Sequence, residues 1–171
     1  MAVLDLLRSV SLGEPIDIGR DVVVIGGGNV AYDVARTVLR QIAFDTARTA
    51  ARLPGTGKVY LVSLETLEEM PADTLEIVEG NEEGITRKNG WGPVSIERDS
   101  SGNVTGVTFR QCSRVFDEQR KFSPVFNDAV RETIPCDTVL LSVGQAPNIS
   151  FLGADVEQMR PAGRRWTSSR R

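Results

Sequence analysis

The segment Asp21–Ala31, which reads DVVVIGGGNVA, constrains the fold of this chain more than any other stretch of its sequence. Residues Asp21–Ile25 end in four consecutive β-branched residues, a run typical of a parallel strand that is buried on both faces. Three glycines follow, and from Asn29 onward apolar residues recur at the spacing of an amphipathic helix. The segment therefore predicts a buried strand, a tight glycine turn and the start of a helix.

The small residues of this turn follow the pattern G-x-G-x-x-A, which is typical of sites that hold the pyrophosphate of a dinucleotide. Gly26 would permit the tight turn, Gly28 would let the backbone approach the pyrophosphate, and Ala31 would let the helix pack closely on the strand. Free N–H groups and the positive end of the helix dipole would then face the phosphates. The alternative is a glycine-rich turn that binds nothing, but the flanking strand and helix favour a nucleotide site.

The end of the next predicted strand, Lys58–Ser63, is the second candidate part of the site. In dinucleotide-binding folds an acidic residue here accepts hydrogen bonds from the adenosine ribose, whereas an arginine accommodates the 2′-phosphate of NADPH. Glu65 is the acidic candidate, and no lysine or arginine occurs between Tyr60 and Thr86. Glu65 lies 37 residues after Gly28 rather than the usual ~20, which a long intervening helix would explain. We therefore predict that NADH is preferred over NADPH; the alternative is a solvated loop glutamate.

The remaining pattern alternates helices and strands before it changes to short strands alone. The helix from Asn29 is expected to end near Leu53, as one long helix or two consecutive ones. A helix within Pro71–Gly84 should turn Leu75 and Val78 inward, with Ile77 as a further candidate. This order predicts an α/β fold, a Rossmann-like parallel sheet flanked by helices with an inserted antiparallel β-meander. The other expected elements are a helix over 2–9 and strands at Ile85–Lys88, Gly92–Glu97, Val104–Cys112, Thr133–Pro135 and Asp137–Ser142.

The absence of histidine excludes histidine-based catalytic triads, His-ligated metal sites and imidazole acid–base chemistry. The two cysteines, Cys112 and Cys136, form no C-x-x-C pair, so the sequence offers neither a redox dithiol nor a cysteine cluster for zinc or iron–sulfur. We predict no catalytic residue and no metal ligand. Any chemistry would come from a bound cofactor, which the protein would bind and orient.

The charge and hydropathy of the chain favour a soluble protein without a nucleic-acid or membrane partner. Its net charge of −3 and pI of about 5.1 argue against a nucleic-acid-binding face. No apolar stretch is long enough to span a membrane and no secretory signal is present, so a cytoplasmic location is expected. The one basic cluster, Arg160–Arg171, is expected to be a solvated tail, with an anionic-ligand patch as the alternative.

Seven blocks carry a resemblance to a known family: VVVIGGGNVAYDVART, LEEMPAD, NEEGI, NGWGP, CSRVFDE, FSPVFND and DTVLLSVGQAPNISFL. In this order they resemble the pyridine-nucleotide domain of glutamate synthase small-subunit-type flavoproteins, over roughly residues 3–152. These are FAD-dependent pyridine nucleotide oxidoreductases with two dinucleotide-binding domains. The resemblance implies that the chain presents NADH or NADPH for hydride transfer to FAD, with electrons passing to an iron–sulfur or other electron-accepting subunit.

The resemblance also assigns roles to individual residues. After the strand Asp137–Ser142, Gly144 would let the backbone approach the cofactor in a return hinge toward the FAD domain, although an ordinary strand-ending turn explains this pattern equally well. Where NADPH-using members carry arginines, this chain has Leu64 and Glu65, which again favours NADH. The pyrophosphate would be held by Gly26, Gly27, Gly28, Asn29 and Val30, and the adenosine ribose by Ser63, Leu64 and Glu65.

Three parts of the family pattern are not found in this sequence: a flavin-binding glycine turn, a cysteine-rich iron–sulfur region and a later Gly-Asp segment that contacts the flavin. We therefore expect residues 1–20 to be a hinge and helix leading from a FAD domain, 21–152 to be the NAD(P)H-binding domain and 153–171 to be a disordered tail. FAD would belong to the intact enzyme and would not be held by this chain alone. The alternatives are a stand-alone nucleotide-binding or regulatory module and a truncated fragment without turnover.

Overall fold

The computed structural model describes residues 3–14, 16, 18–49, 57–143, 158–159 and 165–166. Its helices are α1 (Val3–Ser11), α2 (Asn29–Thr49) and α3 (Thr74–Glu82). Its longer strands are β1 (Val22–Ile25), β2 (Val59–Ser63), β3 (Thr86–Asn89), β4 (Trp91–Arg98), β5 (Val104–Phe116), β6 (Phe122–Pro135) and β7 (Thr138–Leu141). The two-residue strands β8 (Gln158–Met159) and β9 (Arg165–Trp166) pair with each other.

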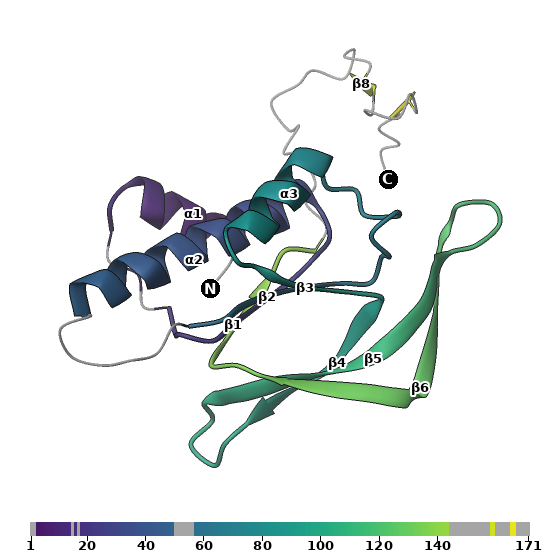
Figure 1. Ribbon diagram of the computed structural model, residues 1–171. Helices are drawn as coiled ribbons and strands as arrows, with labels where there is room; N and C mark the ends of the chain where they lie inside the picture. The colour runs from purple at the N-terminus through teal and green to yellow at the C-terminus, as the bar shows by residue number, and fades with distance from the viewer. Residues whose placement is uncertain are drawn as a thin grey trace, which may run out of the picture.

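The longer strands form two sheets. Strands β3, β2, β1 and β7 lie side by side in this order, and every pair is parallel. Strands β4, β5 and β6 form an antiparallel meander that is inserted in the chain between β3 and β7. Figure 1 shows the helices on one side of the parallel sheet and the meander on the other. The predicted fold class, a Rossmann-like parallel sheet with an inserted meander, is thus confirmed.

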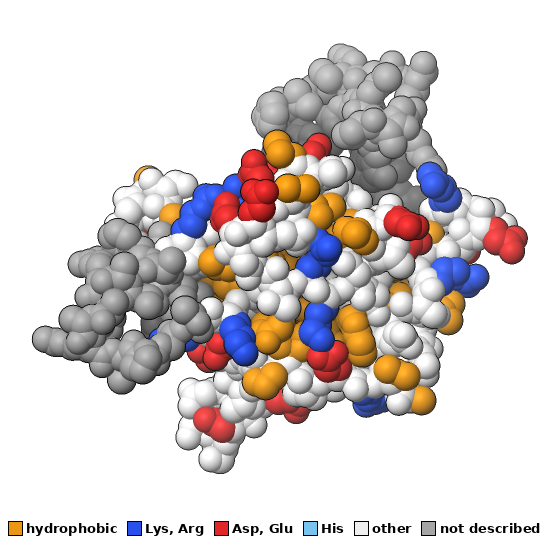
Figure 2. All heavy atoms as spheres, viewed as in Figure 1, with side chains coloured by type: hydrophobic (Ala, Val, Ile, Leu, Met, Phe, Trp, Pro, Cys, Tyr) orange, Lys and Arg blue, Asp and Glu red, His pale blue; other side chains and the backbone are white. Residues whose placement is uncertain are grey.

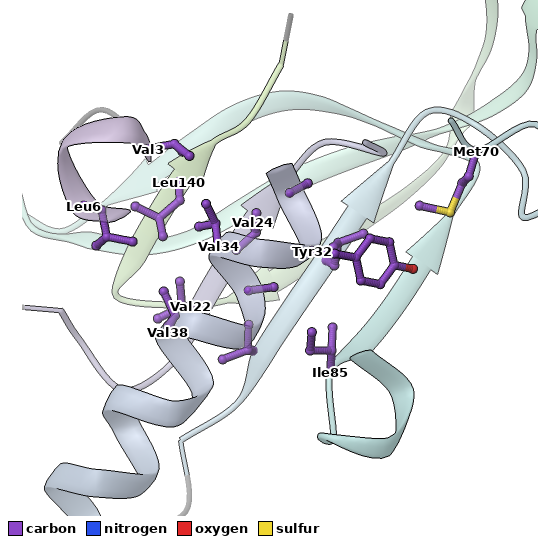
Figure 3. Close-up of a cluster of buried hydrophobic side chains, with 14 residues drawn as sticks. Val3, Leu6, Val22, Val24, Tyr32, Val34, Val38, Met70, Ile85 and Leu140 are labelled. Atoms are coloured by element: carbon purple, nitrogen blue, oxygen red, sulfur yellow. The ribbon is translucent and has the colours of Figure 1, made fainter. Parts of the chain in front are cut away.

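Strand β1 is buried on both faces because its side chains alternate between two hydrophobic cores. Val22 and Val24 pack under the helices, together with Leu6, Tyr32 and other side chains that Figure 3 shows. The opposite face contributes to a second core cluster between the parallel sheet and the meander. This second core cluster consists of Val23, Ile25, Val62, Val107, Phe109, Ile134 and Cys136. The uninterrupted apolar run of β1 therefore reflects a strand held between two layers.

Helix α3 lies within the predicted range, but only part of the predicted face turns inward. Asp73 caps its start, since its carboxylate accepts a hydrogen bond of 2.9 Å from the N–H of Leu75. Leu75 and Val78 are 62% and 45% exposed, so the prediction that they face the core was wrong. The buried residue of α3 is Gly80, where a Cβ would lie only 2.8 Å from the ring of Tyr32. Ile77, the further candidate, is partly buried against the core under the helices, so Ile77 and the close contact at Gly80 attach this helix.

Ion pairs supply a further connection between α2 and α3. Arg36 contacts Glu76, Glu79 and Glu83 at 2.9, 2.6 and 2.8 Å, and Arg40 contacts Glu83 at 2.6 Å. Figure 2 shows acidic and basic side chains side by side over these helices. Burial disfavours the ionised form of Glu83, but hydrogen bonds from Arg40 and Arg36 outweigh this effect and hold the pKa of Glu83 below its ordinary value.

The boundaries of several elements differ from the predicted ones. Strand β6 spans Phe122–Pro135, whereas the sequence predicted only Thr133–Pro135. It is an edge strand whose residues are mostly exposed, so it lacks the apolar alternation that reveals a strand. The expected end of α2 near Leu53 lies outside the described residues.

Among the helices that the structure describes, none combines the length and apolar character needed to cross a membrane.

Candidate nucleotide-binding site

A cleft of about 650 Å³ lies where β1 and β2 end. Open α/β sheets bind their ligands at this carboxyl edge of the strands. The cleft is lined by the glycine turn Gly26–Gly28 with Asn29 and Val30, and by Ser63, Leu64 and Glu65. The structure thus brings together every predicted site residue except Gly144, which lies outside the described residues.

Positions 26 and 28 of the turn favour glycine for different physical reasons. A Cβ at Gly26 would lie 2.4 Å from the carbonyl oxygen of Ser142 and 3.2 Å from the Cβ of Ala31, so the close approach of β1, β7 and α2 requires this glycine. At Gly28, by contrast, no atom lies within 4 Å of the position that a Cβ would take. Packing gives no reason for glycine at Gly28, and the open space above it suits a ligand that approaches the backbone.

The start of α2 presents hydrogen-bond donors to this open space. The N–H of Ala31 donates to the carbonyl of Gly28 at 2.9 Å. The N–H groups of Gly28, Asn29 and Val30 therefore precede the first hydrogen bond of the helix and have no partner within it. The first turn of α2 contains no acidic residue. These donors and the positive end of the helix dipole favour an anion such as a pyrophosphate.

The carboxylate of Glu65 reaches the glycine turn from the end of β2. Its Oε2 lies 2.7 Å from the position of a Cβ at Gly27, so a side chain at Gly27 would displace it. The hydroxyl of Ser63 donates to the carbonyl of Glu65 at 3.0 Å and stabilises the bend between them. An ionised carboxylate at this position can accept hydrogen bonds from ribose hydroxyls and would repel a 2′-phosphate.

Asn89, which sequence reasoning missed, holds the end of β2 in place. Its Nδ2 donates to the hydroxyl of Ser63 at 3.0 Å and to the carbonyl of Glu65 at 3.1 Å. Its Oδ1 accepts a hydrogen bond of 2.9 Å from Nε of Arg87, which sets the orientation of the amide. The sequence carries no local signal for this role, because it depends on the parallel register of β2 and β3.

The side chain of Asn29 connects the glycine turn to the β2–α3 loop. Its Oδ1 accepts a hydrogen bond of 2.7 Å from the N–H of Asp73, the residue that caps α3. Pro71 of the same loop lines the cleft. This contact uses the acceptor oxygen of Asn29 and orients its side chain, so the groups of Asn29 suited to a pyrophosphate are its donors, the backbone N–H and the side-chain Nδ2.

The meander supplies a third part of the cleft, which sequence reasoning also missed. Trp91, Pro93 and Phe122 line it. A Cβ at Gly92 would lie 2.5 Å from the ring of Phe126 and 3.0 Å from Cδ2 of Leu64, so this glycine lets the meander approach the end of β2. The block NGWGP is the available sequence signal, but its position beside the glycine turn becomes evident only in the fold.

Both cysteines are free and buried. Burial raises the pKa of the Cys136 thiol to about 11 and also raises the pKa of Cys112. Both groups are therefore protonated and weakly nucleophilic at neutral pH. Among the described residues, no group of three or more histidine, cysteine, aspartate or glutamate side chains is placed to hold a metal ion.

Comparison with known proteins relates the chain to oxidoreductase subunits, although no protein-family model matches it. It is 32% identical to NADPH-Fe(3+) oxidoreductase subunit beta of Geobacter sulfurreducens, over 90% of this chain and 22% of that protein. It is 32% identical to NADP(+)-dependent formate dehydrogenase subunit beta of Moorella thermoacetica, over 88% and 19% of the two chains. It is 27% identical to the small chain of Escherichia coli NADPH glutamate synthase, over 85% and 29%.

A solved structure shares the fold. FprA of Mycobacterium tuberculosis, determined with NADPH, matches 84% of this chain and 44% of its own with a TM-score of 0.63 and 18% identity. The curated relatives are far longer than the matched region, since this chain spans 22%, 19% and 29% of their lengths. Their names contain NADPH or NADP(+), so they do not support the predicted NADH preference and suggest NADPH instead. The predicted family is confirmed, and the chain is homologous to one segment of the pyridine nucleotide oxidoreductases that include the glutamate synthase small chain.

Proposed function

We propose that this chain binds a nicotinamide dinucleotide, NADH or NADPH, in the cleft where β1 and β2 end. The open space above Gly28 carries the proposal, because it gives a pyrophosphate access to the donors at the start of α2. The carboxylate of Glu65 at the adjacent bend is placed to accept hydrogen bonds from a ribose. The names of the relatives support the same class of nucleotide.

In the longer proteins of this family, we propose that this segment presents the nucleotide for hydride transfer to FAD, with electrons passing to an iron–sulfur or other subunit. The bound nucleotide supplies the hydride, and the residues of this chain bind and orient it. Backbone groups of Gly28–Val30 would hold the pyrophosphate, and Ser63–Glu65 would hold the adenosine ribose. FAD is expected to be bound outside the residues described, which contain one strand–glycine turn–helix unit of this kind.

The preference for NADH or NADPH is a separate proposal. The residues of the cleft favour NADH, whereas the names of the relatives favour NADPH. The carboxylate of Glu65 would repel a 2′-phosphate, and the stretch from Tyr60 to Thr86 supplies no cation to offset it. On the residues of the cleft, we propose that NADH binds more tightly than NADPH. Tighter binding of NADPH than of NADH would contradict this proposal and would agree with the names of the relatives.

Calorimetric titration of the purified chain with each nucleotide tests the proposed function, with Gly28→Val as the key variant. The Cβ of the valine would meet no protein atom within 4 Å, and its methyl groups would fill the space proposed for the pyrophosphate. We therefore expect an unchanged circular dichroism spectrum and a loss of affinity of about a hundredfold or more. Ser100→Val, in the exposed β4–β5 turn, is the control and should bind like the original chain. Equal affinity of Gly28→Val would contradict the site assignment.

The same preparation distinguishes the alternatives. Nucleotide binding without flavin absorbance and without dye reduction by NADH or NADPH would fit a segment that needs a flavin domain for turnover. Bound FAD would contradict our expectation that flavin is held elsewhere. Failure of both NADH and NADPH to bind would favour a folded fragment without a ligand.

A further inference from the structure

We propose that the indole ring of Trp91 is the stacking platform for the adenine base of the bound nucleotide. This inference rests on the proposed function and adds to it a contact from the antiparallel meander. The parallel sheet would then bind the phosphates and the adenosine ribose, while the meander would recognise the flat base. The cleft would thus be completed by two sheets that sequence reasoning treats as separate.

Trp91 has the position and burial that such a platform needs. It is the first residue of β4, and it is half-buried. Part of its side chain packs against the second core cluster, and it also lines the nucleotide cleft. A ring already held by the core loses little conformational freedom when a base stacks on it, which favours binding. Stacking of a nucleic-acid base on an aromatic side chain is a strong and common interaction.

The place of Trp91 along the sheet edge identifies adenine as the base. Gly90, the preceding residue, donates its N–H to the carbonyl of Glu65 at 3.1 Å. Trp91 therefore lies one residue from the bend that we assign to the adenosine ribose. Strand β4, which begins at Trp91, directly follows β3, the strand at one end of the sheet order β3-β2-β1-β7 (Figure 1). A dinucleotide that crosses a Rossmann-like sheet carries its adenosine on this side and its nicotinamide on the side of β7.

Contacts on both sides hold the segment that carries the ring. The N–H of Cys112 donates to the carbonyl of Gly90 at 2.7 Å, and Gly92 lies wedged between Leu64 and Phe126. The position of Trp91 is therefore tied to β5, to β6 and to the end of β2. A preorganised ring of this kind can discriminate between ligands rather than adapt to them.

Other apolar side chains extend the wall beside Trp91. Pro93 and Phe122 line the same cleft, and Phe122 is 65% exposed. Its ring packs edge-on against Phe116, with the centroids 6.4 Å apart and the planes at 75°. A ligand that covers an exposed aromatic ring at the mouth of a cleft removes apolar surface from water, which favours binding. The glycine turn thus provides polar backbone groups and the meander provides apolar surface, in keeping with the two chemical halves of an adenosine diphosphate.

Binding of the two halves of the nucleotide tests this proposal. Calorimetry on the full chain should show that Trp91→Ala weakens the binding of ADP and NADH by about 5- to 150-fold, the range for loss of one base–aromatic stack. Affinity for nicotinamide mononucleotide should stay the same. Trp91→Phe should restore most of the affinity for ADP, whereas Trp91→Leu, which fills space without an aromatic face, should not, and packing alone would not predict that difference.

Fluorescence provides a readout that does not depend on the stability of a Trp91 variant. The chain has two tryptophans, Trp91 and Trp166, so Trp166→Phe leaves Trp91 as the sole indole emitter and serves as the matched tryptophan control. We expect ADP to quench this emission at the concentration at which calorimetry detects binding.

The outcomes separate this inference from the proposed function. If NADH binds the original chain but Trp91→Ala leaves the ADP affinity within twofold and ADP leaves the emission unchanged, the stacking proposal is overturned. A loss confined to nicotinamide mononucleotide would mean that Trp91 meets the other base and would overturn the adenine assignment. Failure of NADH and NADPH to bind the original chain is a failure of the proposed function itself.

Discussion

Asn89 donates a hydrogen bond of 3.0 Å from its Nδ2 to the hydroxyl of Ser63, the residue opposite it in the register of β3 and β2. The same amide reaches the carbonyl of Glu65, and Ser63 also donates to that carbonyl. Three hydrogen bonds thus shape the bend that places the carboxylate of Glu65 beside the glycine turn. Asn89 does not line the cleft, so its influence on a nucleotide would pass through this bend.

Replacing Asn89 should therefore weaken nucleotide binding by misplacing Glu65. For Asn89→Ala we expect the Kd for NADH to rise about tenfold and the free energy of unfolding to fall by about 1–2 kcal/mol, typical of lost part-buried hydrogen bonds. Asn103→Ala is a matched control, because the exposed Asn103 donates a hydrogen bond of 3.0 Å to Asp99 in the β4–β5 turn and shares no partner with Asn89. Calorimetry and urea unfolding measure the two effects. Equal losses of affinity in both variants would argue for general destabilisation instead.

Glu65 should set the discrimination between NADH and NADPH, whichever of them binds more tightly. Glu65→Arg replaces a negative charge beside the predicted ribose site with a cation that can pair with a 2′-phosphate. We expect the ratio of the Kd for NADPH to the Kd for NADH to fall by at least about tenfold, equivalent to about 1.4 kcal/mol. Glu68→Arg, a change of equal charge at an exposed position three residues further along the same loop, should leave the ratio within about twofold. An unchanged ratio of the two Kd values in Glu65→Arg would contradict the assignment of Glu65 to the ribose site.

The fold and the glycine turn could be predicted because their signals are local. The apolar run of β1, the three glycines and the helical spacing after Asn29 lie within one short segment. The role of Asn89 was not predictable, because it depends on which residue of β3 lies opposite Ser63. Leu75 and Val78 were misplaced because α3 contacts the core through Gly80 and Ile77 and is held to α2 by ion pairs. Trp91 was not recognised because the packing of the meander, not its sequence, brings it to the cleft.

Gly92 should be essential to the contact between the meander and the end of β2. In Gly92→Ala the new methyl group would lie 2.5 Å from the ring of Phe126, a distance that forces side chains or backbone to move. We expect a loss of about 1–3 kcal/mol in the free energy of unfolding, which is typical of overpacking. Gly28→Ala is the control, because a Cβ there meets no atom within 4 Å. Phe126→Leu, added to Gly92→Ala, should recover part of the loss, and a purely additive double variant would contradict this explanation.

The ion pairs of Glu83 should make the attachment of α3 depend on acid pH. The pKa of Glu83 is lower in the folded chain than its ordinary value, because the hydrogen bonds from Arg40 and Arg36 outweigh the effect of burial. A carboxylate whose pKa is depressed by folding contributes stability above its unfolded pKa of about 4.3, and this contribution is lost as the pH falls through the folded value. Urea unfolding at a series of pH values should therefore show a smaller loss of stability below about pH 4.3 in Glu83→Gln than in the original chain. Glu82→Gln, next to it and exposed, is the control and should retain the original dependence. If Glu83→Gln keeps that dependence too, the charge of Glu83 is not what attaches the helix.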